Sequence, residues 1–226
     1  MEIKELENKI INADCLDILR QLPDKCIDLV LTDPPYGIGV NKKCVILDGT
    51  VQGKGFGARR SNFAQKDWDD TIPSKDVFQQ LFRVSKNQII WGGNYFTENL
   101  HNSSCWIVWD KDNGTNDFAD CEIAFTSFKS AVRKFEYRWN GCLQGNMKEK
   151  EKRIHPTQKP LPLFQWCLQN YSKEGDLILD CFSGSGTTAV ACHNLNRRFI
   201  CIEKDPEYHA ASVERLKREQ AQMRLF

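Results

Sequence analysis

The stretch that most restricts how this chain can fold lies near its C-terminus, where two apolar segments flank a glycine-rich turn and a helical segment. In order, these are a strand over Leu177–Asp180, a turn over Phe182–Gly186, a helix over Thr187–Leu195 and a strand over Phe199–Glu203. Gly184, Gly186 and Ala189 form the G-x-G-x-x-A pattern of a nucleotide-binding turn, and Glu203 follows about 20 residues later. A βαβ unit of this kind belongs in a mostly parallel sheet with helices on both faces, so the sequence predicts an α/β fold.

Length and composition predict one soluble domain. The 226 residues contain no linker rich in proline or serine, so a single domain over 1–226 is expected. With 31 Lys and Arg against 30 Asp and Glu the net charge is +1, so a polyanionic partner would have to meet local basic patches. None of the ten cysteines forms a C-x-x-C pair and no second histidine stands at ligand spacing from His155, which indicates free thiols and no metal site. Reduced cysteines and the lack of a membrane-length apolar run favour a cytoplasmic protein without membrane contact.

A second strand end carries the tetrapeptide Asp33-Pro34-Pro35-Tyr36. It follows Ile27–Thr32, which has the length and β-branched content of a buried parallel strand. The fixed φ of each proline predicts a stiff elbow whose Asp33 carboxylate and Pro34 carbonyl face outward and suit an amino group. Tyr36 adds a flat face on which a planar ring could stack. A strand stopped by a Pro-Pro turn, with a surface tyrosine, explains the tetrapeptide alone equally well.

Asp14 stands at the end of another expected strand, Ile10–Asp14, and Leu16, Leu19 and Leu22 then mark one face of a short helix. Asp14 therefore either faces a ligand or caps that helix. The other expected elements are helices over Ser74–Val84 and Leu161–Tyr171, a terminal helix opened by Pro206, and strands over Gln88–Trp91, Cys105–Trp109, Glu122–Phe128 and Lys134–Trp139.

Two segments have the composition of insertions. Residues 41–66 combine glycines with basic side chains, among them Lys54, Arg59 and Arg60, which suit contacts with a phosphate backbone. Residues 140–153 are polar and alternate in charge. We expect both to be mobile and the first to close over a polyanion, although solvated surface loops would have the same composition.

The order of the strands along the chain changes what the glycine turn can bind. The chain continues for one helix after the βαβ unit, so the sheet must be completed by strands from the N-terminal part. Asp14, Asp33, Asp180 and Glu203 would then surround one crevice. Acids around the turn disfavour a pyrophosphate and suit a neutral or cationic nucleoside, which describes S-adenosylmethionine. The product would be S-adenosylhomocysteine.

The pairing of Asp33-Pro34-Pro35-Tyr36 early with 180–188 late resembles the amino-group DNA methyltransferases in their β-class motif order. The segments His155–Pro160 and Ala13–Leu16 are similar to two further segments of that family, with Ala13 in place of its usual glycine. The resemblance implies a Rossmann-like methyltransferase fold, with a mostly parallel twisted sheet, helices on both faces and a circularly permuted motif order.

The resemblance also assigns roles to residues. It implies that Phe182, Gly184 and Gly186 wrap the cofactor, that Glu203 holds its ribose and that Asp14 meets its adenine. Thr157 and Lys159 would lie near the methionine end. The full set expected to bind the cofactor is Asp14, Cys15, Asp33, Thr157, Lys159, Asp180, Phe182, Ser183, Gly184, Ser185, Gly186, Thr187, Thr188 and Glu203. The residues expected at the reacting centre are Asp33, Pro34, Pro35 and Tyr36.

The function implied by the resemblance is site-specific methylation of the exocyclic amine of a flipped adenine in duplex DNA, of the kind found in restriction-modification systems. Adenine is favoured over cytosine because Asp at the first position of the tetrapeptide goes more often with adenine. The alternatives are a cytosine-specific enzyme, an RNA or protein-glutamine methyltransferase, a nicotinamide-dependent dehydrogenase, and a nucleic-acid-binding module with a decayed active site. The partner would be double-stranded DNA, contacted by the insertions 41–66 and 140–153, and a homodimer is compatible with the sequence.

Overall fold

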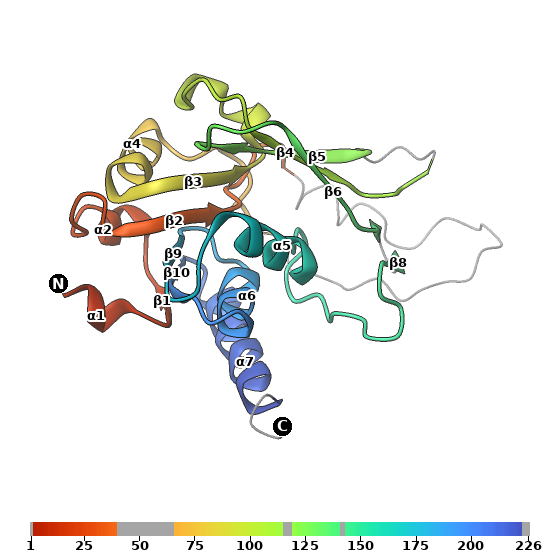
Figure 1. The fold of residues 1–226 in the computed structure, drawn as a ribbon. Helices are drawn as coiled ribbons and strands as arrows, with labels where there is room; N and C mark the ends of the chain where they lie inside the picture. Colours follow the sequence, from red (N-terminus) through yellow and green to blue (C-terminus); the bar gives the residue numbers. More distant parts are fainter. Residues whose placement is uncertain (1, 40–65, 115–118, 141–142, 223–226) are drawn as a thin grey trace.

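Eight strands form one mixed sheet in the computed structural model, which describes residues 2–39, 66–114, 119–140 and 143–222. Their spatial order is β1-β10-β9-β2-β3-β5-β4-β6 (Figure 1). The bounds are β1 (Lys9–Asn12), β10 (Arg198–Glu203), β9 (Leu177–Asp180), β2 (Ile27–Thr32), β3 (Ser85–Trp91), β5 (Cys121–Thr126), β4 (Trp106–Asp110) and β6 (Arg133–Glu136). The first five are parallel, and β5 runs antiparallel to both β3 and β4. A separate antiparallel pair joins β7 (Trp139–Asn140) and β8 (Leu143–Gln144).

Helices cover both faces of the sheet (Figure 1). On one face α2 (Cys15–Leu19) packs against α4 (Lys75–Val84); on the other lie α5 (Leu161–Tyr171), α6 (Thr187–Asn194) and α7 (Pro206–Gln222). The short α1 (Ile3–Leu6) precedes β1, and the 3-10 turns η1 (Gly93–Tyr95) and η2 (Thr97–Asn99) follow β3. The expected α/β class is confirmed.

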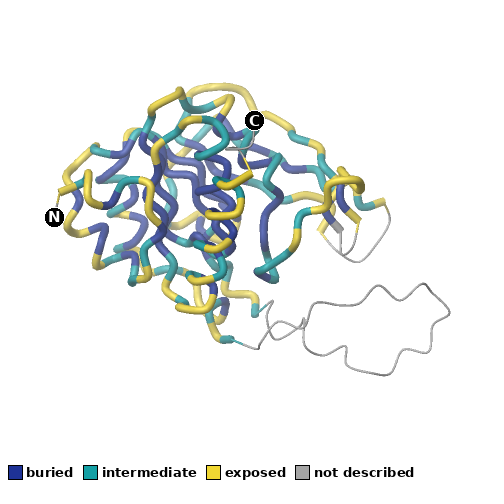
Figure 2. The backbone as a smooth tube through the Cα atoms, turned by 90° about the horizontal axis from the view of Figure 1, so that it is seen from below, coloured by how far each residue is buried: buried dark blue, intermediate teal, exposed yellow. Residues whose placement is uncertain are grey.

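The central strands β2, β9 and β10 are mostly apolar because they are buried on both sides. In β2, Leu29 and Leu31 belong to the cluster beneath α5, α6 and α7, whereas Val30 belongs to the cluster beneath α2 and α4. Successive side chains of a strand point to opposite faces, so a strand covered on both faces cannot alternate with polar residues. Figure 2 shows the buried residues gathered along the middle of the fold.

Most predicted elements have the expected positions, and β2, β9 and α5 have the predicted bounds. The N-terminal strand is a correction: β1 ends at Asn12 and not at Asp14. Asp14 instead is the N-cap of α2, where its side chain accepts a hydrogen bond from the Leu16 N–H. The strand expected at Gln88 begins at Ser85, because its first residues pair with β2 although they are polar.

Two neighbouring central strands send the chain in opposite directions. After β9 the chain passes through α6 to β10 on one side, and after β2 it passes to β3 on the other side. Ligands of open α/β sheets bind outside the carboxyl ends of strands at such a switch point. The fold therefore places the glycine turn and Asp33 next to each other. None of the described helices is long and apolar enough to cross a membrane.

Candidate active site

A cleft of about 1950 Å³ opens at the carboxyl ends of β9 and β2; we call it the switch-point cleft. It is lined by both predicted motifs, so the proline elbow and the glycine turn do share one site. The predicted residues that line it are Asp14, Cys15, Asp33, Pro34, Pro35, Tyr36, Thr157, Lys159, Asp180, Phe182, Ser183, Gly184, Ser185, Thr187, Thr188 and Glu203. Gly186 does not line it, and Lys54, Arg59 and Arg60 lie outside the described residues.

A hydrogen bond from the Thr32 hydroxyl to Asp180, 2.7 Å long, joins the ends of β2 and β9 directly. The Asp180 carboxylate also accepts from the Thr188 hydroxyl and from the Phe182 N–H. Burial raises the pKa of Asp180 to about 6. Since three donors from the protein occupy its oxygens, we interpret Asp180 as a support for the two strand ends.

The glycine turn is fastened to the end of β10. The Gly184 N–H donates to Glu203 Oε2 at 2.7 Å, and the Asp205 N–H donates to Oε1 at 2.8 Å. Gly184 and Gly186 have φ values of +49° and +74°, a conformation that favours glycine. A side chain at Gly186 would press on Ser212 of α7, so this glycine serves helix packing. Glu203 keeps acceptor capacity on both oxygens, which suits a pair of ribose hydroxyls.

The proline elbow is held from a distant part of the chain. Asp69, 2% exposed, accepts hydrogen bonds from the N–H groups of Tyr36 (2.8 Å) and Gly37 (3.0 Å). The Tyr36 ring stacks on the ring of Tyr95 with centroids 4.7 Å apart. Gly92, at φ +69°, lies against the same ring so closely that a side chain there would overlap it. Tyr36 is therefore enclosed, and Tyr95, 42% exposed, presents the outer aromatic face.

Four polar side chains form a network around Asp33. The Lys159 ammonium lies 2.6 Å from Asp33 Oδ2, 2.9 Å from Glu122 Oε2 and 3.1 Å from the Tyr36 hydroxyl oxygen. The Tyr36 hydroxyl donates to Asp33 Oδ1 at 2.7 Å. Lys111 pairs with the other oxygen of Glu122 at 2.5 Å. Lys159, expected near the methionine end of a cofactor, is thus a partner of the predicted catalytic carboxylate.

Burial and neighbouring charges shift the pKa values of this network in different directions. Burial raises the pKa of Asp33, and the Lys159 ammonium offsets only part of that effect. Burial would also raise the pKa of Glu122, but Lys159 and Lys111 outweigh it and lower the value to about 2. Burial would lower the pKa of Lys159, yet the two carboxylates raise it. Burial raises the pKa of Tyr36, so its hydroxyl stays a neutral donor.

The remaining predicted residues have mixed outcomes. Asp14 caps α2 and forms an ion pair of 2.9 Å with Lys204 at the edge of the cleft, so the capping alternative is observed. Burial raises the pKa of Cys15 to about 12, which leaves the thiol protonated. Thr157 contacts the Nδ1 atom of His155 at 3.2 Å through its hydroxyl oxygen.

Sequence reasoning missed Asp69, Glu122 and Lys111. Asp69 stands in no recognisable motif. The sequence pattern indicates Glu122 only as the first residue of an expected strand. Its role becomes visible when β5 pairs with β4, which places Glu122 opposite Trp109. Tyr95, which lines the cleft from η1 after β3, is not among the residues predicted for the site.

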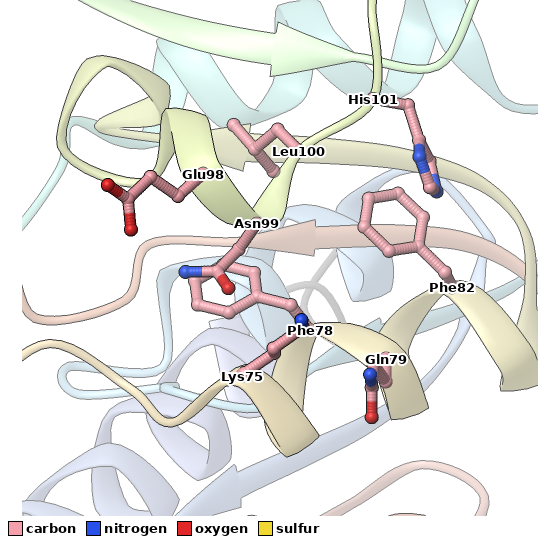
Figure 3. Close-up of a pocket in the computed structure, with 8 residues that line it drawn as sticks. All are labelled: Lys75, Phe78, Gln79, Phe82, Glu98, Asn99, Leu100 and His101. Atoms are coloured by element: carbon pink, nitrogen blue, oxygen red, sulfur yellow. The ribbon is translucent and has the colours of Figure 1, made fainter.

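A second hollow of about 350 Å³ lies between α4 and η2 (Figure 3). Phe82 and His101 approach each other on one side of it, with ring centroids 4.4 Å apart. It contains none of the predicted site residues. In the described part of the chain, no group of three or more His, Cys, Asp or Glu residues is placed to hold a metal ion.

A glycine turn and a strand-end elbow on either side of the switch point define a nucleotide-binding α/β domain of the Rossmann-like class. The family model for DNA methylases matches residues 98–214, more than half of the chain. The chain therefore belongs to the DNA methylase family, whose members methylate the amino nitrogen N6 of adenine or N4 of cytosine.

Individual relatives agree with this assignment. The type II methyltransferase M.HinfI of Haemophilus influenzae is 25% identical over 95% of this chain and 70% of its own length. The crystal structure of the M1.HpyAVI–SAM complex superposes with a TM-score of 0.53 at 23% identity, covering 92% of this chain and 98% of that one. The PvuII DNA methyltransferase, described as cytosine-N4-specific, gives a TM-score of 0.58 at 16% identity over 95% and 91%.

Proposed function

We propose that this protein transfers a methyl group from S-adenosylmethionine to the exocyclic amine of adenine in duplex DNA. The observation that carries the proposal is the junction at the switch point: Asp33-Pro34-Pro35-Tyr36 and the glycine turn line one cleft, and their strands are joined through Thr32 and Asp180. Membership of the DNA methylase family agrees with it.

The residues around the glycine turn fit S-adenosylmethionine. Glu203 is fixed by two backbone N–H groups and retains acceptor capacity for the ribose hydroxyls. Phe182 and Gly184 line the cleft beside it. The related M1.HpyAVI was solved as a complex with SAM. When bound, the cofactor would supply an electrophilic methyl group on its sulfonium.

The proline elbow would activate the target amine. The lone pair of an aromatic amine is delocalised into its ring, and hydrogen bonds to the Asp33 carboxylate and the Pro34 carbonyl would localise it and aim it at the methyl group. The new N–C bond would take the nitrogen lone pair, the C–S electrons would stay on sulfur, and the nitrogen would release one proton. No cysteine nucleophile is needed, which agrees with the protonated Cys15.

The target base has to leave the duplex to reach the elbow. Flipping costs a few kcal/mol, and stacking on an aromatic ring offsets roughly 1–3 kcal/mol of it. We assign this stacking to Tyr95, because the ring of Tyr36 already packs on Tyr95 and Gly92. Our preference for adenine rests on the Asp at position 33, and the PvuII enzyme shows that a similar fold is used for cytosine N4.

The proposal is tested with labelled cofactor and duplex DNA, followed by mass analysis of the nucleosides. We expect N6-methyladenine from the unmodified protein. Asp33→Ala should reduce transfer by on the order of 10²-fold or more, with cofactor affinity within about threefold of the unmodified protein.

Acceptor and cofactor controls separate the alternatives. Methyl transfer to RNA or protein and not to DNA would mean that the substrate is a different macromolecule. Formation of N4-methylcytosine would mean that the target base is cytosine. Thermal stabilisation by a nicotinamide dinucleotide but not by S-adenosylmethionine would favour a dehydrogenase. Near-normal turnover of Asp33→Ala would refute the role of the elbow.

A further inference from the structure

Glu122 has no role in the activity proposed above, yet it is in direct contact with the network that holds Asp33. Its Oε2 atom lies 2.9 Å from the Lys159 ammonium and its Oε1 atom lies 2.5 Å from Lys111. Glu122 comes from β5, Lys159 from the segment before α5, and Asp33 from the end of β2. Three distant parts of the chain therefore meet at one lysine.

Both oxygens of Asp33 already have donors. Lys159 occupies Oδ2 at 2.6 Å and the Tyr36 hydroxyl occupies Oδ1 at 2.7 Å. A target amine that donates to Asp33 must therefore share an oxygen with one of them. Lys159 is the less favourable neighbour, because its positive charge draws electron density from the carboxylate and repels the charge that develops on the amine nitrogen during methyl transfer.

Lys159 cannot withdraw into water. Its side chain is 6% exposed, and a buried ammonium without a counter-ion is strongly disfavoured. Glu122 is the second carboxylate within reach of this ammonium, and its β5 backbone is held in register by β4. Lys159 has a long flexible stem, so a small rotation would shift its ammonium from one carboxylate to the other.

We propose that Glu122 is a positioning residue that takes over the Lys159 ammonium when the target amine binds to Asp33. The proposal rests on the methyltransferase function proposed above. The lysine then keeps a counter-ion, and Asp33 becomes an acceptor for the amine. The pKa values agree with the pairing of Lys159 with Glu122 and of the amine with Asp33. Lys111 and Lys159 together lower the pKa of Glu122 to about 2, while burial raises the pKa of Asp33.

The test compares Glu122→Gln with the double variant Glu122→Gln/Lys159→Met. The amide keeps the shape of Glu122 but cannot neutralise the ammonium, so Lys159 remains on Asp33. We expect kcat of Glu122→Gln to fall at least tenfold at saturating cofactor, with cofactor affinity within twofold of the unmodified protein. Removing the ammonium in the double variant should restore kcat at least threefold over Glu122→Gln alone.

The matched control is Asp110→Asn on β4. Asp110 pairs with Lys134 at 2.7 Å but does not line the switch-point cleft, so this variant should retain full activity. Circular dichroism and thermal unfolding establish that each variant is folded.

Two results would overturn the proposal: kcat of Glu122→Gln within twofold of the unmodified protein, or a double variant no faster than Glu122→Gln. The second result would mean that Glu122 acts independently of Lys159. An unmodified protein that methylates no DNA would instead overturn the proposed function itself.

Discussion

At the scale of single residues, the carboxylates at this edge of the sheet differ through their partners. Asp180 is occupied by two hydroxyls and one backbone N–H. Glu203 binds two backbone N–H groups and faces the cleft. Asp33 is held only by side chains, those of Lys159 and Tyr36. Of these three carboxylates, Asp33 is the one whose partners can be exchanged without the loss of a hydrogen bond from a backbone N–H group. This property suits an acceptor for a reacting group.

Tyr36→Phe tests the hydroxyl of this network. The variant keeps the ring on Tyr95 but loses the donor to Asp33 and the acceptor for Lys159. A hydrogen bond to a charged group contributes about 1.5–3 kcal/mol, so kcat should fall roughly ten- to a hundredfold with little change in cofactor affinity. Steady-state methyl transfer checks this. Tyr137→Phe, which loses a hydroxyl outside the cleft, serves as the control and should match the unmodified protein.

At the scale of helices and strands, the sequence predicts what depends on local pattern. β2 and β9 are mostly apolar segments followed by turn residues, and their bounds are those expected. The glycine turn follows from its spacing. The supports of the site were not predictable, because Asp69 reaches the elbow and Glu122 reaches Lys159 only through tertiary contacts between distant segments.

The turn after β3 is an element whose shape the site requires. Gly92 has a left-handed φ of +69° and lies against the Tyr36 ring. Gly92→Ala should destabilise the fold by at least about 1–2 kcal/mol from the backbone alone, and it should also displace Tyr36. We expect urea unfolding to show the loss of stability and methyl transfer to fall more than tenfold.

Gly114→Ala is the matched control for that experiment. It has a similar φ of +68°, but a side chain there meets none of the described residues within 4 Å. It should lose stability to a similar extent while retaining activity. Equal activity losses in the two variants would contradict a specific effect on Tyr36.

At the scale of the whole molecule, the buried His155 links stability to pH. Its ring packs between Trp68 and Tyr208, with centroid distances of 4.9 and 4.3 Å. Burial, and to a lesser extent the nearby Lys159, lowers its pKa from 6.5 to about 3. His155 is therefore protonated near pH 6.5 in the unfolded chain, but only near pH 3 in the folded protein. Stability from this group is present above pH 6.5 and is lost as the pH falls towards 3.

His155→Phe keeps an aromatic ring and removes this titration. We expect the difference in unfolding free energy between the unmodified protein and His155→Phe to be constant above pH 7. Below pH 6.5 the unmodified protein should lose stability relative to His155→Phe by up to about 1.4 kcal/mol per pH unit. Urea unfolding at pH 7.5 and pH 5 measures it, and an unchanged difference would show that His155 has the same pKa in the folded and the unfolded state.

The strand order has a consequence for how the protein is made. β9 and β10, which are synthesised late, lie between β1 and β2, which are synthesised early. Until Glu203 has left the ribosome, the early strands have unpaired edges where their neighbours belong, and such edges are prone to wrong association. A nascent chain therefore has no switch-point cleft until β9 and β10 have been made and have paired with β1 and β2.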